Sequence, residues 1–191
     1  MRIVFFGSDD FAAVHLKKLL ESSHAIVGCV TQPDRPKGRG MKVAASPVKY
    51  AAVSKKIPLL QPYTLQDKAL LSQLQSFDAD IFVVVAYGRI LPGEILSVPK
   101  IFCVNVHGSL LPQYRGAAPI NWAIINGETE TGVTVIKMSS ILDAGEIIVQ
   151  AKLVIDAQDT AGSLRERMAQ LGAATLIEAL EKIGKNTHSL R

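Results

Sequence analysis

The sequence predicts an α/β fold with a Rossmann-like, mostly parallel sheet and helices on both faces. The first observation is a set of short, continuous apolar runs, which are typical of parallel strands covered on both sides. The second is that segments with helical periodicity separate these runs. The third is the start of the chain, where a strand, a helix and a strand follow within about 30 residues and form a βαβ unit.

Composition favours a single globular domain, 1–191, because 48% of the residues are hydrophobic and 20% are charged. No apolar run approaches the roughly 18 residues that a membrane span requires. The run Ile3–Phe6 is too short for a signal peptide. We therefore expect a cytoplasmic protein without membrane association. The formal net charge of +4 is compatible with a polyanionic partner such as RNA.

The first half of the chain supplies most of the predicted parallel strands. Strands are predicted over 1–6, 25–31, 57–60 and 80–86, with helices from residue 9 or 10 to 21, over 48–55 and over 65–75. Cys29 and Cys103 lie inside apolar runs without a partner motif, so both are interpreted as buried thiols. Three histidines are interpreted as surface or structural residues: His15, His24 and His188.

The second half begins with a short strand over 101–104 and a predicted helix over 116–125. Two further strands, 131–138 and 146–153, are separated by a turn, so we expect a hairpin-like edge of a mixed sheet. A capping signal at Asp159 and Thr160 opens a long helix that reaches about residue 183.

The segment Gln32–Pro47 interrupts this pattern. Its prolines and glycines predict irregular structure across most of its length. Arg35, Lys37, Arg39 and Lys42 make it basic. On these residues alone, a solvated surface loop is the simpler interpretation, although long connections are often functional.

Three polar side chains form a candidate catalytic set. Asn105 and His107 alternate along an extended segment and so point to one face, which on spacing alone is equally compatible with a capping Asn beside a bystander His. Asp143 follows in a glycine-flanked turn and would favour the charged form of His107. An amide can donate to a developing oxyanion, and a carboxylate can accept a proton. Because no nucleophile elbow is present, direct attack by an external nucleophile fits this set best.

Two loops are expected to lie beside each other at the carboxyl ends of strands, where parallel sheets bind ligands. One is Tyr87–Leu91, which follows the strand over 80–86, and the other is the polar stretch that begins at Asn105.

The motif Asn105–Pro112, together with Asp143-Ala144-Gly145, resembles the folate-dependent formyltransferases, which share the glycinamide ribonucleotide formyltransferase fold. Further matches point to the branch that formylates methionyl-tRNA, and the resemblance extends over nearly all of the chain. These matches are Arg115–Ile120, Glu130–Thr134, Thr31–Gly40 and Ser46–Lys49.

The resemblance implies transfer of the formyl group of 10-formyltetrahydrofolate to the α-amino group of methionyl-initiator tRNA, in translation initiation. It implies catalysis by Asn105, His107 and Asp143 without a metal. The positions that match the folate-binding segments are Tyr87, Gly88, Arg89, Ile90, Leu91, Ser109, Leu110, Leu111 and Pro112. The resemblance also implies that the basic loop contacts tRNA. The residues that would contact its phosphates are Arg35, Lys37, Arg39 and Lys42.

The resemblance also leaves alternatives. The family carries a C-terminal β-barrel domain that helps to hold tRNA, and we expect this chain to lack it and to act as a monomer. A folate-dependent sugar N-formyltransferase shares the central motifs, but a nucleotide sugar does not require a long basic loop. A hydrolase that deformylates the same folate would differ only in using water. A non-catalytic RNA-binding module is disfavoured by the intact Asn105, His107 and Asp143 set.

Overall fold

The computed structural model describes residues 1–37 and 42–185. The chain divides into two compact units, an N-terminal unit, Met1–Cys103, and a C-terminal unit, Val104–Arg191. Each unit contains helices packed on strands, so the predicted α/β class is confirmed.

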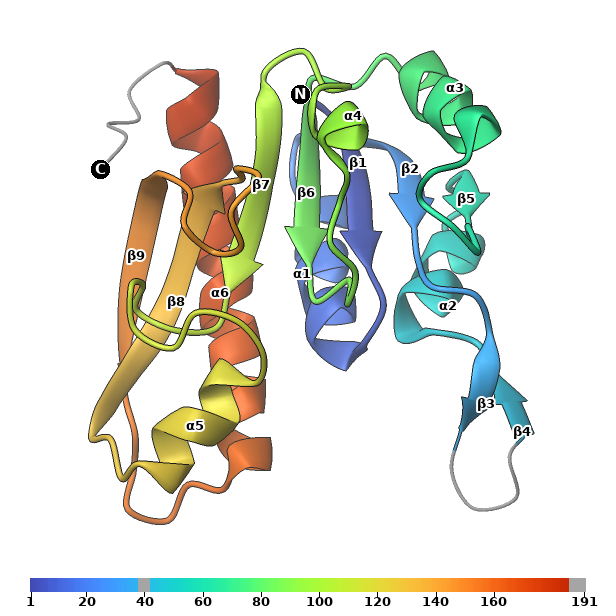
Figure 1. Ribbon diagram of the computed structural model, residues 1–191. Coiled ribbons are helices and arrows are strands. Elements are labelled where there is room, and N and C mark those ends of the chain that lie inside the picture. The colour runs from blue at the N-terminus through green and yellow to red at the C-terminus, as the bar shows by residue number, and fades with distance from the viewer. Residues whose placement is uncertain (38–41, 186–191) are drawn as a thin grey trace. The chain divides into compact units, whose positions relative to one another are not determined.

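The N-terminal unit is built on four parallel strands (Figure 1). Strand β1 (Arg2–Gly7) pairs with β2 (Ala25–Val30) on one side and with β6 (Ile81–Val85) on the other, and β2 pairs with the short β5 (Leu59–Leu60). The apolar side chains of β1 and β6 are buried on both faces. This is the arrangement that continuous apolar runs predict.

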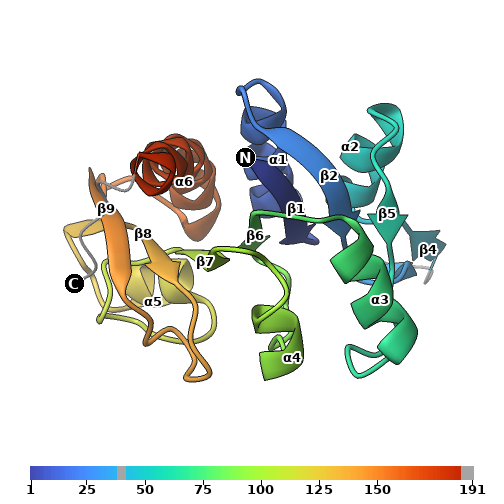
Figure 2. The same cartoon turned by 90° about the horizontal axis from the view of Figure 1, so that it is seen from above.

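Helices cover both faces of this sheet. Figure 2 shows α1 (Asp10–Leu20) and α2 (Pro47–Ser54) on one face, and α3 (Lys68–Ser76) and α4 (Gly93–Leu96) on the other. The predicted helices are confirmed, but α3 begins three residues later than expected. Asp67 explains the shift, because its carboxylate accepts from the amide of Ala69 and caps the helix. The single turn of α4 is too short to give a periodic signal.

The segment Gln32–Pro47 contains two short strands that the sequence analysis did not predict. Strands β3 (Arg35–Lys37) and β4 (Lys42–Ala44) form an antiparallel hairpin. Pro36 is tolerated in register with Val43 because each strand of a two-stranded ladder keeps one unpaired edge, where a missing N–H costs nothing.

The C-terminal unit contains an antiparallel ladder. Strand β8 (Glu130–Lys137) pairs with β7 (Phe102–His107) on one side and with β9 (Ile147–Val154) on the other, which confirms the predicted hairpin. The long helix α6 (Ala161–Gly184) packs on β8 and β9 (Figure 1).

Helix α5 (Pro119–Ile125) begins three residues later than predicted. The reason is the backbone just before it. Tyr114 and Ala118 have φ values of 53° and 56°, and Gly116 has 89°. These left-handed conformations are incompatible with a continuous right-handed helix.

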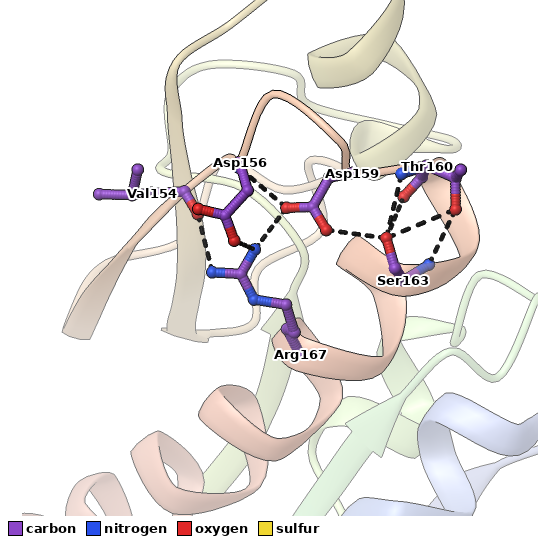
Figure 3. Close-up of polar contacts among 6 residues, drawn as sticks. All are labelled: Val154, Asp156, Asp159, Thr160, Ser163 and Arg167. Carbon is purple, nitrogen blue, oxygen red and sulfur yellow. Dashed lines mark hydrogen bonds and ion pairs between the residues drawn. The ribbon is translucent and has the colours of Figure 1, made fainter.

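The start of α6 is held by a dense polar cluster (Figure 3). Thr160 and Ser163 form a reciprocal capping box, in which each side chain accepts from the backbone amide of the other. Arg167 pairs with Asp159 and with Asp156, and it donates to the carbonyl of Val154 at 3.1 Å. The hydrogen bond from the backbone amide of Asp156 is the leading cause of the lowered pKa of Asp159.

Both cysteines are buried, as predicted, and burial raises the pKa of each thiol to about 12. Across residues 1–37 and 42–185, no helix is both long and apolar enough to cross a membrane.

Candidate active site

The C-terminal unit brings Asn105, His107 and Asp143 together. The side-chain amide of Asn105 donates to Asp143 Oδ1 at 3.3 Å, and His107 Nδ1 lies 3.6 Å from Asp143 Oδ2. The side chains of His107 and Asp143 are 7% and 9% exposed. Antiparallel pairing of β7 with β8 fixes the two strand residues on one face, and the turn after β8 returns the carboxylate to them.

His107 is held by the backbone as well as by the carboxylate. Its Nε2 lies 2.8 Å from the carbonyl oxygen of Tyr114. Because a carbonyl only accepts, Nε2 carries a proton, and the neutral ring therefore presents its lone pair at Nδ1 toward Asp143. A proton taken up at Nδ1 would lie between imidazole and carboxylate. Nδ1 is thus the ring nitrogen that faces the carboxylate of Asp143.

Asp143 is held in a strained turn. Its φ is 48°, in the left-handed region, and the backbone amide of Gly116 donates to its Oδ2 at 2.9 Å. Gly145 completes the turn, since a Cβ at that position would lie 1.8 Å from the carbonyl oxygen of Lys137. The glycine that flanks Asp143 in the sequence therefore lets the chain turn back tightly against the end of β8.

The predicted folate segment Ser109–Pro112 is fastened to β8 and β9. Thr134 Oγ1 donates to the carbonyl of Ser109 at 2.6 Å and accepts from the amide of Leu111 at 3.0 Å. Gln150 Nε2 donates to the carbonyl of Leu111 at 2.9 Å and to Thr134 Oγ1 at 3.0 Å. Thr134 is fully buried, so these bonds fix the loop backbone in a site shielded from water.

The second predicted folate segment, Tyr87–Leu91, belongs to the N-terminal unit. Its first carbonyl, that of Tyr87, accepts from Gln32 Nε2 at 2.7 Å and from Ser8 Oγ at 3.3 Å. Arg89 donates to the carbonyls of Pro62 and Tyr63, both at 3.1 Å. Within the segment, Leu91 is buried and Ile90 is exposed. The segment is therefore anchored at both its start and its middle.

Three of the predicted tRNA-contacting residues, Arg35, Lys37 and Lys42, lie on the hairpin of β3 and β4. Arg35 is exposed at the start of β3, and the backbones of Lys37 and Lys42 face each other in register. Arg39 lies outside the described residues.

The base of the hairpin is fastened by polar contacts. Lys49 Nζ pairs with Asp34 at 2.6 Å, and Gln61 Nε2 donates to the same carboxylate at 2.8 Å. These hydrogen bonds, that of Lys49 first, lower the pKa of Asp34. Thr31 Oγ1 lies 2.7 Å from Ser46 Oγ and joins the two ends of the segment. The hairpin thus leaves the N-terminal unit from a fixed stem.

The sequence analysis assigned no role to several residues that hold the candidate catalytic side chains or the folate segments in place. These residues are Tyr114, Gly116, Thr134, Gln150 and Gln32. Most of them lie inside motifs that the resemblance had already matched, but their role depends on backbone atoms. Thr134 carried a direct signal, as a buried polar residue between Val133 and Val135 of β8.

No group of three or more His, Cys, Asp or Glu side chains in the described ranges is arranged to hold a metal ion. The Asn105, His107 and Asp143 cluster offers an amide donor, an imidazole and a carboxylate at one point. That combination suits attack by an amine on an acyl carbon, because it can stabilise an oxyanion and remove a proton.

Comparison with known proteins places this geometry in context. Residues 1–180 match the family described as Formyl transferase. The chain is 50% identical over 183 residues to a methionyl-tRNA formyltransferase of Clostridioides difficile (strain 630), covering 96% of this chain and 59% of that protein. A methionyl-tRNA formyltransferase of Synechococcus sp. (strain JA-2-3B'a(2-13)) is 54% identical over 188 residues, covering 97% of this chain and 58% of that protein. The chain thus spans just under three fifths of the length of these relatives.

Among solved structures, glycinamide ribonucleotide transformylase 1 from Symbiobacterium toebii superimposes with a TM-score of 0.81. The match covers 97% of this chain and 88% of that chain at 21% sequence identity. At this identity the likeness establishes the fold alone.

Proposed function

The chain belongs to the formyl transferase family, and from that premise we propose that it transfers the formyl group of 10-formyltetrahydrofolate to the α-amino group of methionyl-initiator tRNA. The observation that carries the reaction type is the convergence of Asn105, His107 and Asp143 on one point. Relatives about half identical to this chain over nearly its whole length support the acceptor.

The amine is the nucleophile in the proposed reaction. The neutral α-amine attacks the formyl carbon, a tetrahedral oxyanion forms, and the bond from that carbon to N10 of the folate breaks. Asn105 donates one amide N–H to Asp143, so its second N–H is available for the oxyanion. The attacking amine loses one proton, which Asp143 accepts directly or through a water, and N10 takes one proton as it leaves.

We propose that His107 acts in the reaction through Nδ1. Its Nε2 proton is committed to the carbonyl of Tyr114, so Nδ1 is the nitrogen that can donate to the reacting group. The reacting formyl group would then lie on the side of Nδ1 and Asp143. The acid and the base of the reaction would share one edge of the cluster.

The basic hairpin supports a nucleic-acid acceptor. Arg35 is exposed, and the stem below it is held by the Asp34–Lys49 ion pair, so positive charge projects from a fixed base. Cations of this kind contact phosphates without reading sequence. We place Lys37, Arg39 and Lys42 in the same role. We propose folate contacts for Tyr87–Leu91 and for Ser109–Pro112, each of which is held by hydrogen bonds within its own unit.

The test is a parallel assay of the purified chain with 10-formyltetrahydrofolate and three acceptors, namely methionyl-tRNA, an amino-sugar nucleotide and water. We expect formylation of methionyl-tRNA, and loss of about 10²–10⁴-fold in rate when Asp143 is changed to Asn or Ala. Preferential formylation of the sugar would show that the acceptor is an amino sugar, and folate hydrolysis without transfer would show that it is water. Either result would contradict methionyl-tRNA as the acceptor. Full activity of Asp143→Ala would remove the proposed mechanism.

A further inference from the structure

One short segment holds two members of the candidate catalytic cluster. The carbonyl of Tyr114 accepts from His107 Nε2 at 2.8 Å, and the amide of Gly116 donates to Asp143 Oδ2 at 2.9 Å. These two backbone groups belong to residues only two positions apart, and they contact the His107 imidazole and the Asp143 carboxylate, which face each other. The segment Tyr114–Gly116 therefore sets the distance between His107 and Asp143.

This backbone conformation requires support. Tyr114 has a φ of 53° and carries a large side chain, so its left-handed conformation costs roughly 1–2 kcal/mol. Such a conformation persists only where the surroundings hold it. The required support must come from the Tyr114 side chain or from its immediate neighbours.

The phenol of Tyr114 supplies that support. Its hydroxyl donates to Glu128 Oε1 at 2.5 Å and accepts from Asn126 Nδ2 at 3.0 Å. Both partners lie in the turn between α5 and β8. The amides of Asn126 and Glu128 bond to the carbonyls of Trp122 and Ala123 on α5, so the turn is itself fixed.

We infer that Tyr114 and Glu128 are positioning residues for the catalytic cluster, because their hydrogen bond holds the segment Tyr114–Gly116 that orients His107 and Asp143. This inference rests on the proposed function for its kinetic consequence, although the geometry stands without it.

The hydrogen bond to Glu128 is also the main cause of the raised pKa of the Tyr114 phenol. A phenol that stays protonated remains a donor, so the contact to the carboxylate is retained across the neutral range. Changing Glu128 to Ala should therefore lower the pKa of Tyr114, which ultraviolet titration of the phenol can follow.

The experiment compares Tyr114→Phe, Glu128→Ala and Glu128→Gln with the parent chain. Tyr114→Phe and Glu128→Ala should each lower kcat about tenfold or more, with KM for both substrates nearly unchanged, because misplaced catalytic groups slow the chemical step. Glu128→Gln keeps an oxygen acceptor and should restore most of the rate. The double variant should be no worse than either single one, since both remove the same contact. Tyr50→Phe, an exposed tyrosine on α2, is the matched control.

A second measurement does not depend on activity. The imidazole nitrogen shifts of His107, assigned by comparison with His107→Gln, should show Nε2 protonated in the parent chain and an altered tautomer balance in Tyr114→Phe. If the parent chain transfers no formyl group but Tyr114→Phe still changes the His107 shifts, the positioning role is supported and the proposed function is contradicted. Unchanged kcat together with unchanged shifts in Tyr114→Phe, in a variant that melts like the parent, would overturn the inference.

Discussion

Two buried histidines, one in each unit, differ in the polar groups that surround their rings. His15 on α1 is 0% exposed and His107 on β7 is 6% exposed. Each places one ring nitrogen 2.8 Å from a backbone carbonyl, that of Phe11 or of Tyr114. They differ at the second nitrogen. His107 Nδ1 faces the carboxylate of Asp143, whereas His15 Nε2 finds no hydrogen-bond partner among the described residues.

The difference shows that burial and one hydrogen bond do not make a histidine useful for acid–base chemistry. His15 stacks near the ring of Phe11, with centroids 4.7 Å apart, and burial lowers its pKa to about 4. It behaves as a neutral core residue. His107 faces the carboxylate of Asp143, which also accepts a hydrogen bond from Asn105, so three polar side chains meet at this point.

The largest expected effect comes from removing each imidazole in turn. His107→Gln should lower the rate of formyl transfer by about 10²–10⁴-fold, because the acid at Nδ1 is lost. His15→Gln should leave kcat within about twofold of the parent at a temperature where both chains are folded, since His15 lies outside the cluster. Steady-state formylation kinetics measure both. Equal losses of rate in the two variants would contradict the prediction that His107, and not His15, takes part in the reaction.

A second effect should appear in stability against pH. The folded state disfavours the charged form of His15, whereas the unfolded chain protonates it at the ordinary value of 6.5. Its contribution is therefore complete above pH 6.5 and is lost as the pH falls toward about 4, by about 3 kcal/mol in total. Urea unfolding at several pH values should show this decline. His15→Leu should flatten it, and an unchanged slope would assign the decline to other groups.

The smallest effect concerns a buried hydroxyl that serves a loop. Thr134→Val keeps the shape of the side chain but leaves the carbonyl of Ser109 and the amide of Leu111 without their partner, at a cost of about 1–3 kcal/mol. We expect KM for the folate to rise about tenfold with a smaller change in kcat. Thr131→Val, a buried threonine on the same strand, is the control. Equal effects in the two variants would indicate general loss of stability.

Most of the fold could be predicted from the sequence because its strands are continuous apolar runs with helical segments between them. The errors fall where backbone conformation decides the structure. The hairpin of β3 and β4 forms although Pro36 argues against a strand, and α5 starts late because Tyr114 and Ala118 adopt left-handed conformations. A positive φ at a tyrosine has no sequence signal.

In the candidate site, too, the sequence could identify residues that act through their side chains but not those that act through their backbone. Asn105, His107 and Asp143 could be selected because their side chains are of types that can carry out acid–base chemistry and because their motifs are specific. Tyr114 and Gly116 contribute a carbonyl and an amide, which every residue possesses, so their types do not reveal the contact. The predicted proximity of the Tyr87–Leu91 loop to the Asn105 stretch remains a prediction.

The cluster at the start of α6 has a consequence for hydrogen exchange. The first amides of a helix ordinarily exchange rapidly, because they lack partners within the helix. Here the amide of Ser163, in the first turn of α6, bonds to Thr160 Oγ1, and the amides of Asp156, Asp159 and Thr160 just before the helix also bond to oxygens inside the cluster (Figure 3). Deuterium should therefore reach these four amides only when the cluster opens as a unit, together with the neighbouring end of β9 to which Arg167 joins it.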